Sequence, residues 1–487
     1  MQSSFSSLDW IVFVSYFLLL TISSILLSRN KINSSRDFFL TKNGMPMFAV
    51  AISILATSQS AATFLGAPEF SYAHDFTFIG FYISALLAVT FVAFVFIPRF
   101  YEMKAVTVYE LLEIRYGSEA KKYAGVMFLV GRVLASGARL YIGALAISMI
   151  LFSDIVFLHV AISIFILVTG ALAYTYFGGV RSVILSDIIQ AVTYIGAGVA
   201  VLVFLYYSLE SVDIIATLQE HNKLNFYDTS LDGKFSIIGL LSGWLLLNIA
   251  AFGLDQDMTQ RVLTCKSKNE ATKSLILSII MTIPVVLLFL AIGALLFVFY
   301  QESDVVQNFE GEKITIFMYY ILNEMPEGLR GLVTVGAIAA ALSSTNSVLG
   351  AMASVAVEDL YKPYKLQNSS VDELHFVKAS RVAVLLFALT LSLMAMVSYY
   401  WQQYSDLSLI GFALGVMAFA YTGLLGVYFS AIFTKRGNEQ TVLYSLIGGF
   451  VTVLALQPYT FGMSIGFSWQ IVIGTFVAFC IMQFGKK

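Results

Sequence analysis

Charged residues are scarce in this sequence, and their scarcity excludes a soluble protein. Only 12% of the 487 residues are charged, whereas 59% are hydrophobic and the mean hydropathy is +0.83. Soluble domains carry about 25% charged residues. The apolar residues also come in runs of roughly twenty, the length that a helix needs to cross the hydrocarbon core of a bilayer. We therefore expect an all-α integral membrane protein.

Cysteine and histidine are also rare, which leaves few ways to build a metal centre or a catalytic site. Cys265 and Cys480 lie far apart and form neither a disulfide framework nor a metal-binding motif. The histidines have no metal-ligand spacing either; they are His74, His159, His221 and His375. Catalytic triads, phosphate-binding loops and nucleic-acid signatures are missing. We expect neither enzyme activity nor a nucleic-acid partner.

Thirteen apolar runs alternate with charged or turn-rich breaks and predict thirteen spanning helices. The runs cover residues 9–27, 46–66, 77–98, 123–151, 155–175, 184–207, 236–256, 274–299, 329–356, 379–400, 407–432, 440–456 and 468–484. The first run has no basic region before it and no small-residue cleavage site, so we expect a retained helix and not a signal peptide. No soluble domain is expected beside this single transmembrane unit, residues 1–487.

The basic residues predict the orientation of these spans. Cytoplasmic loops of membrane proteins carry an excess of lysine and arginine. With the N-terminus outside, 22 of the 28 basic residues fall in cytoplasmic segments, whereas the outer loops 208–235 and 300–328 are acidic. We expect a multi-pass protein of the plasma membrane (the inner membrane of a bacterium), with a cytoplasmic C-terminus.

Two of the expected spans are interrupted by small and polar residues. The second span reads ATSQSAAT from Ala56 to Thr63, and the seventh carries Asn248 and Gly253 within an apolar run. Paired interruptions in corresponding helices indicate the binding site of a secondary transporter, because unwound backbone frees carbonyl oxygens for an ion. The alternative is that small residues allow close helix packing.

A polar stripe follows one face of the ninth span. Ala340, Ser343, Ser344 and Ser347 are spaced by three and four residues, so they share a helix face, and Asn346 lies beside them. Hydroxyl oxygens are suitable ligands for Na⁺. The alternative is that each serine bonds to its own helix backbone.

The charged residues within or near the start of the expected spans include Asp187, Arg132 and Arg139. A charge at the centre of a span costs about 2.5–3.5 kcal/mol on insertion scales, so such residues are usually functional. Asp187 either serves a site or pairs with Arg181 at the interface. Arg132 and Arg139 share a helix face, and either is expected to pair with a substrate carboxylate or a protein acid. Tyr141 nearby either stacks on a substrate or packs.

Four stretches together resemble the sodium:solute symporter family, and the resemblance covers the whole chain. They are IPRFYEMKAVTVYELLEIRYG (97–117), FGGVRSVILSDIIQ (177–190), GLDQDMTQRVL (253–263) and AAALSSTNSVLG (339–350). The resemblance implies a leucine-transporter-type core of two inverted five-helix repeats, residues 46–207 and 236–432. One extra helix (9–27) precedes this core and two helices (440–484) follow it.

The resemblance also implies binding sites. A sodium site would use carbonyls near Ala56, Gln59 and Ala340 and the hydroxyls of Ser343 and Ser344. A second sodium ion, present in some members, would use Asp187, Ser343, Asn346 and Ser347, although Asn346 stands where those members have serine. The substrate pocket would be lined by Ser58, Ser60, Thr63, Phe78, Phe81, Tyr141 and Asn248, with Arg139 added by the argument above.

Departures from the family pattern narrow the solute. Sugar carriers have glutamate and glutamine where this chain has Ala62 and Thr63, which disfavours a hexose. Sialic acid carriers share Ser60 and Thr63, but their carboxylate-binding arginine falls at Ala135. We expect import of a small polar or carboxylate-bearing solute by alternating access, driven by one or two Na⁺, the only metal ion expected. A membrane-embedded solute sensor and a proton-coupled symporter using Asp187 stay open as alternatives.

Overall fold

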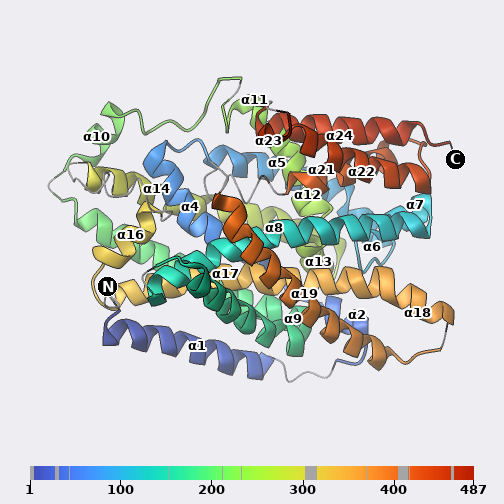
Figure 1. The fold of residues 1–487 in the computed structure, drawn as a ribbon, viewed down its shortest axis with the longest axis horizontal. Helices are drawn as coiled ribbons and strands as arrows, with labels where there is room; N and C mark the ends of the chain where they lie inside the picture. The colour runs from blue at the N-terminus through green and yellow to red at the C-terminus, as the bar shows by residue number, and fades with distance from the viewer. Residues whose placement is uncertain are drawn as a thin grey trace.

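Helices form the regular secondary structure of this protein, as the apolar runs predict (Figure 1). The computed structural model describes residues 5–27, 32–42, 44–152, 154–210, 212–231, 233–301, 315–368, 370–403, 415, 417–461 and 465–486. Over these residues, seven helical segments are long and apolar enough to cross a membrane, and two bent pairs raise the number to nine. The expected count of thirteen is therefore not confirmed and stays a prediction.

The seven long segments follow the predicted runs closely. They are α1 (Ser7–Leu27), α5 and α6 (Ile79–Val95 and Ile97–Glu102), α8 (Ser118–Phe152), α9 (Phe157–Tyr207), α14 (Lys268–Tyr300), α17 (Leu329–Ser354), which continues through a π-helix (Val355–Tyr361) into α18 (Lys362–Asn368), and α19 (Glu373–Gln403). Two expected spans, 155–175 and 184–207, join in α9, whose backbone is non-helical at Gly179.

The two interrupted spans are broken helices. α3 (Met47–Ser58) and α4 (Ala61–Ala73) meet at 61°, and α11–α12 (Ile237–Leu240 and Gly243–Gly253) meets α13 (Gln256–Leu263) at 50°. The first break lies at Gln59 and Ser60, which both have extended backbone. The second lies at Asp255, whose carboxylate accepts a hydrogen bond from the Asp257 amide (2.9 Å).

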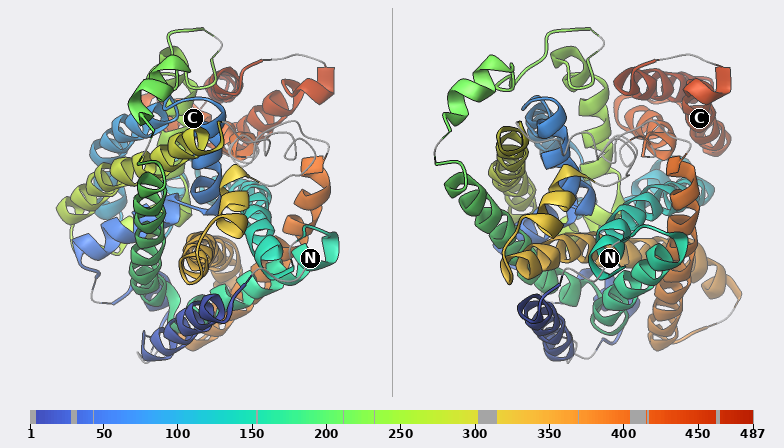
Figure 2. Two further views of the ribbon diagram at one scale, coloured as in Figure 1. Left: turned by 90° about the vertical axis from the view of Figure 1, so that its left-hand side faces the viewer. Right: turned by 60° about the vertical axis from the view of Figure 1, so that its left-hand side comes forward.

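Three shorter apolar helices complete the bundle: α21 (Ala418–Phe433), α22 (Glu439–Ala455) and α24 (Phe467–Gln483). The start of the expected span 407–432 lies partly outside the described residues. Five short helices lie between longer ones along the chain: α2 (Ser35–Leu40), α7 (Glu110–Tyr116), α10 (Ile214–Glu220), α16 (Ile316–Asn323) and α23 (Pro458–Phe461). In all views α1 (dark blue) and the C-terminal helices (red) lie on opposite sides of the bundle (Figures 1 and 2).

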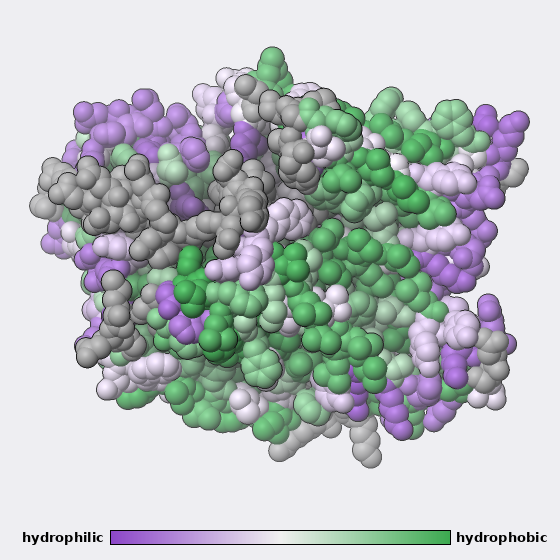
Figure 3. Space-filling model, in the orientation of Figure 1, coloured by the Kyte–Doolittle hydropathy of each residue, from purple (hydrophilic) through white to green (hydrophobic). Residues whose placement is uncertain are grey.

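Apolar and hydrophilic residues occupy different parts of the surface, as expected for a protein that spans a bilayer. A broad apolar area crosses the middle of the molecule, and hydrophilic residues gather at the two ends where the helices terminate (Figure 3). Phe94, Phe165 and Phe476, for example, are each about two-thirds exposed. Such a large exposed apolar surface is stable only in lipid or against a partner. The chain termini lie at opposite ends of the bundle (Figure 1).

Candidate functional site

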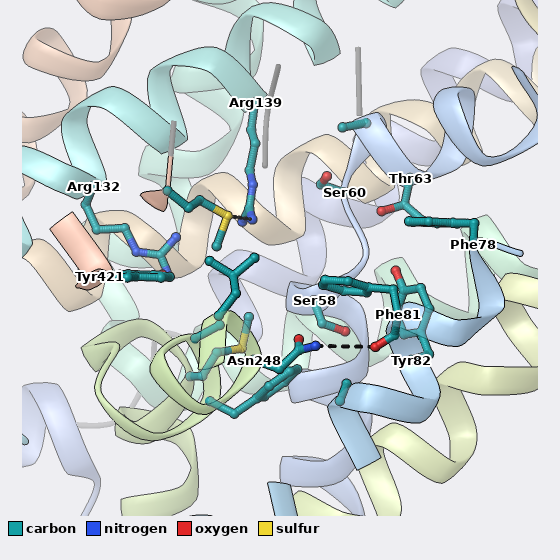
Figure 4. A pocket seen from close by; sticks show the side chains of 17 residues that line it. Ser58, Ser60, Thr63, Phe78, Phe81, Tyr82, Arg132, Arg139, Asn248 and Tyr421 are labelled. Atoms are coloured by element: carbon teal, nitrogen blue, oxygen red, sulfur yellow. Dashed lines mark hydrogen bonds between the residues drawn. The ribbon is translucent and has the colours of Figure 1, made fainter. Parts of the chain in front are cut away.

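Both broken helices border one cavity, called here the central cavity (Figure 4). Its empty volume, with the open space at its mouth included, is about 770 Å³. It is lined by residues from the α3–α4 break, α5, α8, α12, α13 and the start of α21: Ser58, Ser60, Ala62, Thr63, Phe78, Phe81, Tyr82, Ala85, Arg132, Arg139, Leu247, Asn248, Ala251, Phe252, Met258, Met417 and Tyr421.

Seven of the eight residues predicted for the substrate pocket line this cavity. They are Ser58, Ser60, Thr63, Phe78, Phe81, Arg139 and Asn248. Polar groups and two phenyl rings therefore face one space, with Asn248 fixed by a hydrogen bond from its amide nitrogen to the Phe81 carbonyl (3.3 Å). Tyr141 is not among the lining residues: it is buried and donates to Gln402 Oε1 (2.8 Å).

Several lining residues were not predicted. The Tyr82 hydroxyl accepts a hydrogen bond from Gln59 Nε2 (3.3 Å), which links the first break to α5. Its place four residues after Phe78 on a helix could have indicated it. Met417 and Tyr421 come from α21, and no polar interruption in the sequence points to them.

Arg132 and Arg139 lie in different electrostatic surroundings. Arg132 is paired with two acids of the second break: its Nη2 lies 2.5 Å from Asp255 Oδ2 and 3.2 Å from Asp257 Oδ2. All three side chains are at least 97% buried. Tyr421 also donates its hydroxyl proton to Asp255. Arg132 therefore has protein acids as partners, one of the two alternatives that the sequence left open.

Arg139 has no acidic partner within ion-pair distance in the part of the chain that the structure describes. Its Nη2 instead donates to the Met417 sulfur at 3.0 Å, which is a weak acceptor. The side chain points from α8 into the central cavity (Figure 4). A cation in such a place is costly without an opposite charge, so an anionic ligand would stabilise it.

Asp187 pairs with Arg261 and not with Arg181, so the second of the two alternatives that the sequence left open for this carboxylate is wrong. The fully buried carboxylate accepts hydrogen bonds from Ser53 (2.5 Å), Ser343 (2.8 Å) and Arg261 Nη2 (3.3 Å). Arg181 is exposed instead. Arg261 also lies 3.0 Å from Asp257 Oδ1. The residues Arg132, Asp187, Asp255, Asp257 and Arg261 thus form one continuous ion-pair network.

The polar stripe of α17 faces the first broken helix. Ser347 Oγ lies 3.0 Å from Thr57 Oγ1, and Arg261 donates to the same serine. Ser344 bonds to its own helix at the Ala341 carbonyl (3.1 Å), as the alternative interpretation expected. Gln59 Oε1 is buried and accepts no hydrogen bond from any described residue. This oxygen is therefore free to serve another ligand.

The described ranges contain no group of three His, Cys, Asp or Glu side chains that could hold a metal ion. The carbonyls, hydroxyls and amides at the α3–α4 break and on α17 are hard oxygen ligands, the kind that an alkali-metal ion takes.

Comparison with known proteins finds sodium-coupled transporters. The model of the sodium:solute symporter family matches residues 38–449. The sodium/sialic acid symporter SiaT of Proteus mirabilis is 27% identical over 97% of this chain and 93% of its own length. Mouse sodium-coupled monocarboxylate transporter 1 is 26% identical over 86% of this chain and 68% of that protein.

A solved structure shares the fold closely. It is a substrate-bound, outward-open Na⁺-coupled sialic acid symporter, with a TM-score of 0.85, 25% identity, and 98% of this chain and 97% of that chain covered. A nucleobase-cation-symport-1 transporter, 14% identical with a TM-score of 0.56, shares the fold alone. The neighbours are transporters and not enzymes, as expected from the absence of catalytic motifs.

Proposed function

Because the chain belongs to the sodium:solute symporter family, we propose that this multi-pass, Na⁺-coupled symporter imports a small carboxylate-bearing organic solute by alternating access. The observation that carries the proposal is Arg139: its guanidinium faces a cavity at two helix breaks and has no acidic partner among the described residues. Both kinds of relative named above, the sialic acid and the monocarboxylate carriers, move carboxylates.

The solute is proposed to bind across the central cavity. Its carboxylate would contact Arg139, while Ser58, Ser60, Thr63 and Asn248 would bond its other polar groups. Phe78 and Phe81 supply an apolar wall for its carbon skeleton. A hexose fits this arrangement poorly, because it would leave the guanidinium without a counter-charge.

One sodium ion is proposed to bind between α3 and α17. Its ligands would be the carbonyls of Ala56, Gln59 and Ala340 with the hydroxyls of Ser343 and Ser344. Support comes from the contact between Thr57 and Ser347, which holds the two helices together at this level. Na⁺ bound here would fix the first break, and the fixed break would present Ser58 and Ser60 to the solute.

A second sodium site is proposed at Asp187, Ser343, Asn346 and Ser347. There the ion would share the Asp187 carboxylate with Arg261, whose Nη2 lies 3.3 Å from it. This competition predicts that the second ion binds more weakly than the first, because the guanidinium repels it. A proton is the alternative occupant of the same carboxylate.

Uptake into proteoliposomes tests the proposal. With an inward Na⁺ gradient, a panel of labelled monocarboxylates, amino acids and sugars should show accumulation of a carboxylate and none of a hexose. Ser343→Ala and Ser344→Ala should each weaken the Na⁺ dependence about tenfold, the loss expected for one ligand worth about 1.4 kcal/mol. Ser392→Ala is the matched control, since that hydroxyl only bonds to the Ala388 carbonyl.

Two outcomes would contradict the proposal. Solute uptake that is independent of the Na⁺ gradient, and that is unchanged in both serine variants, would contradict sodium coupling. Uptake driven by a proton gradient without Na⁺, and abolished by Asp187→Asn, would establish the proton-coupled alternative instead.

A further inference from the structure

The segment between α10 and α11, called here the strap, buries one of its aromatic side chains. The structure describes the strap at residues 222–231 and 233–236, and Figure 1 shows it running along the edge of the bundle (light green). Connecting segments usually run over the surface with exposed side chains. Tyr227 fits this rule with 71% exposure, whereas Phe235 is only 1% exposed. The bundle therefore receives Phe235 as it would a core residue.

Phe235 packs against one half of each broken helix. Its ring centroid lies 5.3 Å from that of Phe70 on α4 and 5.4 Å from that of Trp244 on α12, and the Phe235 and Trp244 rings are stacked at 27°. The Trp244 indole N–H donates to the Lys234 carbonyl (2.8 Å), which fixes the strap beside α12. A single side chain of the strap therefore joins α4 to α12, which are far apart in the sequence.

The same cluster of rings extends to the wall of the central cavity. Phe235 lies 5.1 Å from Phe78 at 64°, and Trp244 lies 5.5 Å from Phe81 at 82°, measured between ring centroids and ring planes. Aromatic pairs favour such edge-to-face arrangements at these distances. Phe78 and Phe81 stack on each other and line the cavity, whereas Phe235 is not a lining residue (Figure 4). Phe235 therefore contacts the cavity wall from behind.

The other end of the strap is attached to the end of α4. The Lys223 ammonium donates to the Tyr72 carbonyl (2.5 Å) and lies 4.3 Å from the centroid of the Phe297 ring on α14. In the turn between α4 and α5, the Phe76 amide donates to the Asn225 carbonyl (3.0 Å). The strap is therefore fixed at both ends, so the buried ring between them has a defined position.

We propose that Phe235 is a positioning residue of the solute site, which holds Phe78 and Phe81 as the apolar wall against which the solute packs. The proposal rests on the proposed function, because it needs a solute to bind in the central cavity. A side chain behind the wall touches no solute atom, so its loss changes how firmly the wall is held. Solute binding should weaken while turnover continues, so KM should rise and the maximal rate should change little.

Hydrogen exchange of the purified full-length protein in Na⁺ buffer, with no solute added, tests whether Phe235 holds the wall. Phe235→Ala should speed amide exchange over residues 76–82, because this segment would open locally more often. Exchange in α22, which lies elsewhere in the bundle, should stay at the wild-type rate. Phe235→Leu keeps a large apolar side chain and should restore part of the protection. Tyr227→Ala is the matched control, since it removes an exposed ring from the same strap.

Uptake kinetics in proteoliposomes test the consequence for the solute. The probe is the solute that the wild-type protein accumulates from the panel of monocarboxylates, amino acids and sugars. Phe235→Ala should raise its KM about tenfold, the effect of losing one or two ring contacts, and Phe235→Leu should raise it less. Tyr227→Ala should leave KM at the wild-type value.

Three results would overturn the role of Phe235. They are unchanged exchange over residues 76–82 in both Phe235 variants, an unchanged KM, and a fall in maximal rate without a change in KM. Accumulation of a sugar and not of a carboxylate by the wild-type protein would contradict only the proposed function, because the KM comparison can be made with either solute.

Discussion

Asp187 and Arg261 form a buried ion pair whose two members should depend on each other. Removing one partner of such a pair costs about 3–5 kcal/mol, because the other charge stays buried and uncompensated. Arg261→Gln should therefore lower the melting temperature of the detergent-purified protein strongly. The double variant Asp187→Asn with Arg261→Gln should recover part of the loss. Arg181→Gln is the control, since Arg181 is exposed; equal stability of Arg261→Gln and wild type would contradict the pairing.

Substitution of one arginine of α8 should lower stability, and substitution of the other should abolish transport. Arg132→Gln leaves Asp255 and Asp257 with one guanidinium fewer, so it should lower the melting temperature by an amount corresponding to about 3–5 kcal/mol. Arg139→Gln removes a guanidinium without an acidic partner among the described residues, so it should leave the melting temperature near wild type and abolish solute uptake. Melting curves and uptake measured on the same preparations check both. A destabilised Arg139→Gln variant with normal uptake would reverse the assignment.

At the residue scale, the sequence is enough to identify the charged side chains within the spans, but it does not identify their partners. A charge within an apolar run is visible from its neighbours, so Arg132, Arg139 and Asp187 could be found without a structure. The partner of Asp187 could not, because Arg261 is 74 positions away and the two meet only when α9 and α13 both pack against α3 and α17. Tyr141 follows Arg139 in the chain by two positions, yet its hydroxyl turns to Gln402 on α19.

At the element scale, the kink of α9 depends on a glycine. Gly179 has φ of +58°, and a Cβ at this position would lie 2.5 Å from the Phe38 carbonyl oxygen of α2. Gly179→Ala should therefore lower the melting temperature, because both the backbone conformation and the contact with α2 are incompatible with a side chain. Gly196→Ala is the matched control on the same helix: no atom lies within 4 Å of the added Cβ, and alanine favours the helix by roughly 1 kcal/mol. Equal effects of the two substitutions would contradict the explanation.

Both broken helices could be predicted because small and polar residues interrupt otherwise apolar runs. The end of the second broken helix could not be predicted. The expected span stopped at residue 256, since the following segment contains Asp257 and Arg261 and looks like a loop. In the structure that segment is the buried helix α13. Its charges are satisfied by the ion-pair network, and a compensated charge has no signature in a hydropathy pattern.

At the scale of the whole molecule, the burial of Cys265 should make its reactivity depend on pH. Burial raises the pKa of this thiol to about 11. The thiolate is the reactive form of cysteine. With a pKa this high the thiolate is scarce at neutral pH, and below the pKa its fraction rises about tenfold for each unit by which the pH increases. Maleimide labelling of Cys265 in a Cys480→Ala background should rise accordingly between pH 7 and pH 9, as mass spectrometry can measure. Labelling that is fast at pH 7 and levels off near pH 9, the ordinary pKa of a thiol, would contradict the raised pKa.

The slow reaction of Cys265 at neutral pH makes it possible to test the orientation of the protein in the membrane. The distribution of lysine and arginine predicts an outer N-terminus, and the structure places the termini at opposite ends of the bundle (Figure 1). Tyr227 and Ile114 are 71% and 73% exposed and lie in segments predicted to be outside and inside, respectively. A membrane-impermeant maleimide at pH 7 should therefore label Tyr227→Cys in intact cells, and Ile114→Cys only after permeabilisation, each in the Cys480→Ala background. The reverse pattern would mean that the charge asymmetry has been assigned to the wrong side. The direction of solute import and the side from which Na⁺ enters would then have to be reversed as well.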